Sequence, residues 1–147
     1  MLPRKQEAVG DARFIFASDS RKVKVRAVES HLRPYQSADS LVYFTSGYDA
    51  AGMPIIKSRT IIEEAHLFAH QASLIAEEET FDIIHAHDWT SYLAGVAAKI
   101  ASGKPLILHV HATSFDQAAS ENVDPSIYKI ECEAFAVADK VVVVSNW

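Results

Sequence analysis

The second half of the chain alternates helix-like segments with short apolar runs, and this alternation constrains the fold more than any other feature. Residues 60–79 carry apolar side chains at spacings of 3 and 4, which predicts an amphipathic helix. Further helices are predicted over 89–101 and 125–138. The apolar runs that we expect to form buried strands are 82–86, 105–110 and 140–144.

Residue types at the predicted helix ends support these boundaries. Asp88 is a candidate N-cap of the second helix, and Gly103 closes that helix. Asp124 and Pro125 are typical of the N-cap and the first position of the third helix. Parallel strands joined by right-handed helical crossovers are the expected outcome. We therefore predict an α/β fold with an open, mostly parallel sheet and helices on both faces.

The first half of the chain is more weakly patterned. Residues 22–28 alternate apolar with basic side chains, which predicts a half-exposed strand at or near a sheet edge. Short strands are also predicted over 13–17 and 41–44, and a turn region over 47–54. The sequence shows no internal repeat and no boundary to a second domain.

Composition excludes several functional classes. The chain has 14 Lys+Arg against 19 Asp+Glu and a net charge of -5, which argues against a nucleic-acid partner. No stretch approaches the ~20 apolar residues of a membrane span, and the first residues lack the apolar core of a secretory signal. The single cysteine, Cys132, is expected in the core and cannot form an internal disulfide. We therefore expect a cytoplasmic protein.

Polar side chains gather where the predicted strands end. His85 and His87 end one strand, and His109 and His111 end the next. Because side chains alternate along a strand, the two members of each H-x-H pair share a face of the sheet. Ligands of open parallel α/β sheets bind at the carboxyl ends of the strands. The other candidate residues at these ends are Asp88, Trp89, Thr113, Ser145 and Asn146.

Three interpretations of the four histidines stay open. In the first, His85 and His109 sit inside the fold and bond to the backbone, while His87 and His111 are ordinary loop-end residues. In the second, they form a metal site that Asp88 completes. In the third, they bind a sugar or phosphate, and Trp89 offers an apolar ring face. Asp88 has its own simpler interpretation as a helix cap alone, and Glu131 is expected at the surface.

Four segments together resemble a known family. They read FDIIHAHDW (81–89), LAGVAAK (93–99), GKPLILHVHAT (103–113) and IYKIECEAFAVADKVVVVSN (127–146). As a set they are similar to the first, Rossmann-like domain of GT-B glycosyltransferases, specifically the glycogen/starch synthase-like group. The stretch SHLRPY (30–35) lies where relatives carry a similar loop. The resemblance covers about half the chain firmly and implies a Rossmann-like sheet.

The resemblance also implies a chemistry. These enzymes transfer a sugar from a nucleotide-sugar with retention of configuration, and they need no metal or other cofactor. The second domain holds the nucleotide-sugar, and the first holds the glycan acceptor. His111 matches the histidine beside the transferred sugar, and Asp88 matches the cleft aspartate, so both are expected to be catalytic. The substrate-binding residues that the resemblance implies are His87, Trp89, His109, Thr113, Ser145 and Asn146.

The chain departs from the family pattern at both ends. Relatives begin with a strand and a glycine-rich loop, whereas residues 1–4 look like the tail of their second strand. The sequence also stops before a donor-binding domain would start. We therefore expect residues 1–147 to be a single, incomplete GT-B N-terminal domain, inactive by itself and prone to self-association through an unpaired sheet edge.

The function implied for the full enzyme is transfer of glucose to an α-glucan or related acceptor. Two other functions stay open at this point. One is a non-catalytic carbohydrate-binding or interaction module. The other is a metal-dependent hydrolase built on the two H-x-H pairs, His85/His87 and His109/His111, together with Asp88. A truncated product without a function of its own is the last possibility.

Overall fold

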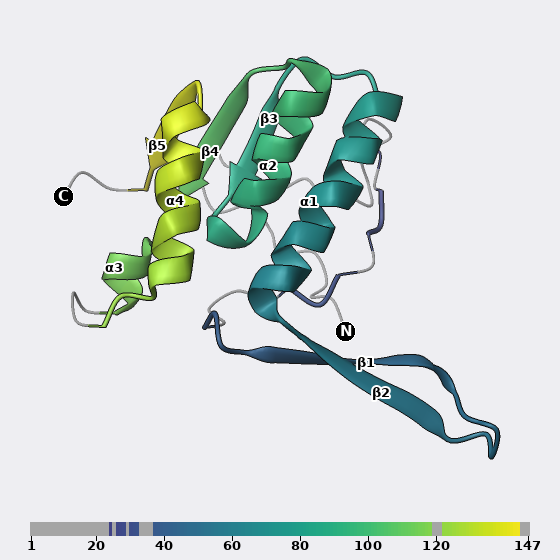
Figure 1. Cartoon of the computed structure of the whole chain (residues 1–147). Coiled ribbons are helices and arrows are strands. Elements are labelled where there is room, and N and C mark those ends of the chain that lie inside the picture. The colour runs from purple at the N-terminus through teal and green to yellow at the C-terminus, as the bar shows by residue number, and fades with distance from the viewer. Residues whose placement is uncertain (1–23, 25, 29, 33–36, 119–121, 145–147) are drawn as a thin grey trace, which may run out of the picture.

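The computed structural model describes residues 24, 26–28, 30–32, 37–118 and 122–144 (Figure 1). The strand predicted over 13–17 and most of the one over 22–28 lie outside this part of the chain. Within it, the structure forms a hairpin and a larger α/β body. The elements are β1 (Leu41–Tyr48), β2 (Pro54–Thr60), α1 (Ile61–Glu78), β3 (Ile84–His87), α2 (Trp89–Ser102), β4 (Leu106–Val110), α3 (Ser114–Gln117), α4 (Pro125–Val137) and β5 (Lys140–Val143).

The body contains a three-stranded parallel sheet in the order β3-β4-β5. Helix α2 connects β3 to β4, and α4 precedes β5, as the alternation of segments predicts. The register places His87 opposite His109 and Leu108 opposite Val141. The α/β class and the Rossmann-like parallel arrangement are therefore confirmed.

Asp124 and Gly103 cap helices as predicted, and α1 begins with a capping box that was not predicted from the sequence. Thr60 and Glu63 form a capping box at the start of α1. The Asp124 carboxylate accepts hydrogen bonds from the backbone N–H groups of Ser126 and Ile127 at the start of α4. Gly103 ends α2 in the left-handed conformation, at φ 68°. These local interactions fix the start of α1, the start of α4 and the end of α2.

The core lies between the sheet and the layer that α1, α2 and α4 form side by side (Figure 1). Leu106 and Leu108 on β4 are fully buried, and Trp89 and Tyr92 pack beside them from α2. Gly95 lets α2 approach the sheet, since a Cβ there would come within 2.9 Å of the Ala86 Cβ and the Leu106 Cδ1. A wider separation between α2 and the sheet would disrupt the packing of Leu106 and Leu108.

The two faces of the parallel sheet differ in burial, because only one of them packs against the described long helices. Along β4, Leu106, Leu108 and Val110 are buried, whereas Ile107 and His109 between them are only half-buried. All four residues of β5 are exposed, so the expectation of a buried strand there is wrong. The reason is position: within the described residues β5 is an edge strand, and the described long helices cover one face. Cys132 is exposed as well, contrary to the expected core position.

Strands β1 and β2 form an antiparallel hairpin that projects from the base of α1 (Figure 1). The strand predicted over 41–44 is confirmed and longer, and Asp49 Oδ1 accepts two backbone N–H groups in the turn, from Ala51 and Met53. The Arg59 guanidinium lies 4.0 Å from the centroid of the Phe44 ring.

None of the helices in the described part of the chain has both the length and the apolar character needed to cross a lipid bilayer.

Candidate functional site

Four histidines and one aspartate meet at the carboxyl ends of β3 and β4. His85 and His87 belong to β3, and His109 belongs to β4. Asp88 directly follows β3, and His111 directly follows β4. Ala86 and Leu108 point into the core, so the intervening histidines are on the opposite face. The structure therefore brings both H-x-H pairs together, as their positions at the strand ends predict.

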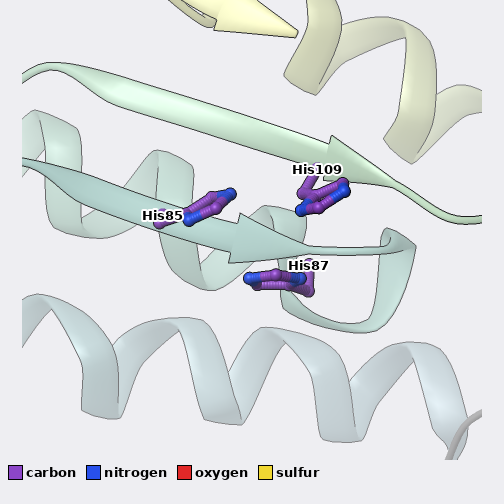
Figure 2. A group of neighbouring side chains, drawn as sticks. All are labelled: His85, His87 and His109. Carbon is purple, nitrogen blue, oxygen red and sulfur yellow. The ribbon is translucent and has the colours of Figure 1, made fainter. Parts of the chain in front are cut away.

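His85, His87 and His109 form a compact group, the three-histidine cluster (Figure 2). The ring centroids are 4.4 Å apart for His85 and His87, 4.9 Å for His87 and His109, and 5.4 Å for His85 and His109. Each ring offers one nitrogen within 4.8 Å of the nitrogens of the other two. Partial desolvation, followed by the neighbouring histidines, lowers the pKa of His87. Its imidazole is thereby favoured in the neutral form.

His111 is bound differently, because it pairs with Asp88. Its backbone N–H donates to Asp88 Oδ1 at 2.8 Å, and its Nδ1 lies 2.9 Å from Asp88 Oδ2. A carboxylate only accepts hydrogen bonds, so we assign the proton of the His111 ring to Nδ1. In the neutral ring, Nε2 is then left as an acceptor.

The structure corrects the interpretation of Asp88 as a helix cap alone. Asp88 occupies the N-cap position of α2, but its side chain makes no capping hydrogen bond, because both carboxylate oxygens bond to His111. Its backbone has φ 57° and ψ 168°, a conformation that non-glycine residues rarely adopt. The N–H of Asp88 donates to His109 O at 3.0 Å, and its carbonyl accepts from Ser91 N at 3.0 Å. These bonds hold the strained residue in place.

Trp89 does not lie where the resemblance implies. Its side chain is 2% exposed and packs in the core, so it offers no ring face to an acceptor. The neighbouring Tyr92 is also buried, and its hydroxyl donates to His109 O at 3.3 Å. Burial raises the pKa of Tyr92 well above its ordinary value. Both aromatic residues are therefore buried in the core, and Tyr92 also bonds to the end of β4.

The segment after His111 is anchored by a buried carboxyl group. Thr113 caps the short helix α3 through a capping box with Asp116, so its side chain is engaged locally. Ser114 donates from its backbone N–H and from its hydroxyl to Glu131 of α4, at 2.8 and 2.5 Å. Glu131 is only 3% exposed, so the expectation of a surface position is wrong. Neither α3 nor this anchor was predicted from the sequence.

Glu131 makes stability depend on pH in a predictable direction. Burial is the main cause that raises the pKa of Glu131 above 4.5, and Asp116 and Asp88 add to it, while the Ser114 bonds oppose it. The folded state therefore keeps a proton that the unfolded state has lost, so stability falls as pH rises from about 4.5 through the folded pKa. We expect Glu131→Gln to gain stability relative to the original chain between pH 5 and pH 7.

Urea unfolding at the two pH values measures this difference. Glu133→Gln is the matched control, because Glu133 is on the same helix and its side chain is 62% exposed. If Glu131→Gln instead lost more stability at pH 7 than at pH 5, the ionised carboxylate would be the form that Ser114 requires.

A groove of about 660 Å³ opens between α1 and β3 beside the histidines. His85 and His87 line it from the strand, and Phe68 and Ala72 line it from α1. This groove gives a ligand access to the three-histidine cluster. The predicted substrate-binding residues Ser145 and Asn146 lie outside the described residues, and their roles stay predictions.

The comparisons with known proteins agree with this arrangement. Residues 20–147 match the family model of Glycosyltransferase Family 4, whereas a comparison with curated proteins found no match. The matched region includes the parallel sheet, the three-histidine cluster and the Asp88–His111 pair. The resemblance to glycosyltransferases is thereby confirmed at the level of the family. The chain belongs to glycosyltransferase family 4.

Proposed function

We propose that this domain forms the acceptor side of a retaining glycosyltransferase that moves glucose from a nucleotide-sugar to an α-glucan or a related acceptor. The observation that carries the proposal is the Asp88–His111 pair at the carboxyl ends of β3 and β4. This is the edge of a parallel sheet where ligands bind. Both side chains are partly exposed, at 36% for Asp88 and 44% for His111.

The pair suits the chemistry of sugar transfer. With the Nδ1 proton directed at Asp88, His111 Nε2 is free to accept a hydrogen bond from a sugar hydroxyl. The transition state of glycosyl transfer carries positive charge on the sugar ring. When the sugar ring binds next to Asp88, the negative charge of the Asp88 carboxylate stabilises this transition state.

The leaving diphosphate needs positive charge from elsewhere. Within the described residues, Asp88 forms an ion pair with His111 and with no lysine or arginine. We therefore propose that a donor-binding domain outside residues 1–147 supplies the cations and holds the nucleotide. On this division of labour, the 147-residue chain binds acceptor but turns over no nucleotide-sugar.

Titration of the chain with maltoheptaose, followed by NMR, tests the acceptor role. We expect saturable shifts that include the His111 ring, and an affinity lowered more than ~10-fold by His111→Asn, because the hydrogen bond from a sugar hydroxyl to Nε2 is lost. Asp82→Asn and His70→Asn are controls, because both residues are exposed and outside the pair. Failure of the folded chain to bind any α-glucan would count against the acceptor role. Steady release of ADP or UDP from a glucose donor would count against the division of labour.

A further inference from the structure

We propose that His85, His87 and His109 bind one divalent transition-metal ion, of the zinc class, on the face of the parallel sheet that the described long helices leave uncovered. The site is separate from the Asp88–His111 pair, and sugar transfer as proposed above does not require it. The inference rests on three observations: the strand register, the unpartnered ring nitrogens, and the ligand type.

The strand register assembles the site. His87 and His109 are direct neighbours across the β3–β4 pair, and His85 lies two residues before His87 on the same face. The three ring nitrogens that face one another are within 4.8 Å. A tetrahedral ion with Zn–N bonds of about 2.0–2.1 Å needs nitrogens roughly 3.3 Å apart. Binding would therefore draw the three rings closer together, by rotation of their side chains about χ1 and χ2.

The ring nitrogens have no competing partners among the described residues. His109 Nδ1 is buried and has no hydrogen-bond partner in this part of the chain. A buried polar atom without a partner destabilises the fold, and a bound cation would satisfy it. His111 is the informative contrast. It is also close, at 4.6 Å from His109 between ring centroids, but its nitrogens are not among those that lie within 4.8 Å of one another. We therefore leave His111 and Asp88 out of the ligand set.

The donor set selects the class of ion. Three neutral imidazoles suit Zn²⁺, Cu²⁺, Ni²⁺ and Co²⁺, whereas Mg²⁺ and Ca²⁺ need oxygen ligands. Three protein ligands leave a fourth position for water or a small anion. His85 and His87 line the groove beside α1, so an ion can reach them from solvent.

Metal titration of the 147-residue chain tests the site without any assay of activity. After removal of metal with a chelator, Zn²⁺ is titrated by calorimetry, and Co²⁺ is added separately to record its visible absorption. We expect one ion per chain, a tetrahedral Co²⁺ spectrum, and a raised thermal midpoint with Zn²⁺. His87→Asn and His109→Asn should each weaken binding more than ~10-fold.

The double variant His66→Asn/His70→Asn is the matched control. These exposed histidines lie four residues apart on α1, so they are the surface pair best placed to bind an ion adventitiously. Circular dichroism shows whether each variant folds. The proposal is overturned if the folded chain binds no ion stoichiometrically. It is also overturned if binding survives both cluster variants or is lost in the α1 control. These readouts measure metal binding alone, whereas the maltoheptaose titration tests the Asp88–His111 pair, so the failure of one proposal can be told from the failure of the other.

Discussion

Trp89→Ala is expected to lower the free energy of unfolding by about 3–5 kcal/mol, the largest effect on stability that we anticipate for a single substitution. The indole is 2% exposed and packs against the buried residues of the sheet and α2. Removing it leaves a cavity that the surrounding backbone cannot fill, because β3 and α2 meet at this point. Urea or guanidinium unfolding, fitted to a two-state transition, gives the difference.

Tyr48→Ala is the control, since this aromatic side chain is 71% exposed and its loss should change stability by less than about 0.5 kcal/mol. A Trp89→Ala chain with unchanged stability but without glycan binding would support the role beside the acceptor that the sequence resemblance implies. A strongly destabilised chain assigns Trp89 to the core.

Substitutions of Asp88 separate its chemistry from its backbone strain. Both Asp88→Gly and Asp88→Ala remove the two hydrogen bonds to His111, but only glycine adopts φ 57° without strain. We therefore expect the glycine variant to be about 1–3 kcal/mol more stable than the alanine variant. In both variants the ¹⁵N shifts of His111 should report a mixture of ring tautomers, and glycan affinity should fall.

The two Asp88 variants act as controls for each other, because they lose the same contacts. Equal stabilities would show that the backbone at residue 88 relaxes once the carboxylate is gone. An unchanged His111 tautomer would show that something other than Asp88 holds the Nδ1 proton, and the proposed role of the pair would then fail.

Much of the fold follows from local sequence patterns. The periodicity of 60–79 places α1 within about two residues, because one buried face imposes a strict period, and the short apolar runs place β3, β4 and β5 equally closely. Strand β2 was missed because its burial pattern does not alternate: most of its residues are exposed, and pairing with β1 defines it. The burial of Glu131 was missed because its partner, Ser114, is on another element.

In the candidate site, too, local patterns predict some features, and others depend on tertiary contacts. Strand alternation predicts that His85 and His87 share a face and that both H-x-H pairs meet at one edge. The pattern does not tell which histidines group together, because this depends on the register of β3 against β4. It depends also on the Asp88 carboxylate, which bonds to His111 and does not cap α2. The tertiary structure determines which of these two partners the carboxylate has. Helix caps that involve neighbours in sequence are easier to predict than those that compete with distant partners.

The β1–β2 hairpin has a consequence for the dynamics of the chain. Its inner end joins the core through Val42, whereas side chains toward its tip, such as Tyr48, Met53 and Ile56, are exposed. The free energy needed to separate its two strands therefore comes from the hairpin itself, and little of it from the core. The hairpin can open while the parallel sheet stays folded, so its amide protons exchange with solvent through local opening rather than through global unfolding. The slow-exchanging amides should instead be those of β4, which is hydrogen-bonded on both sides.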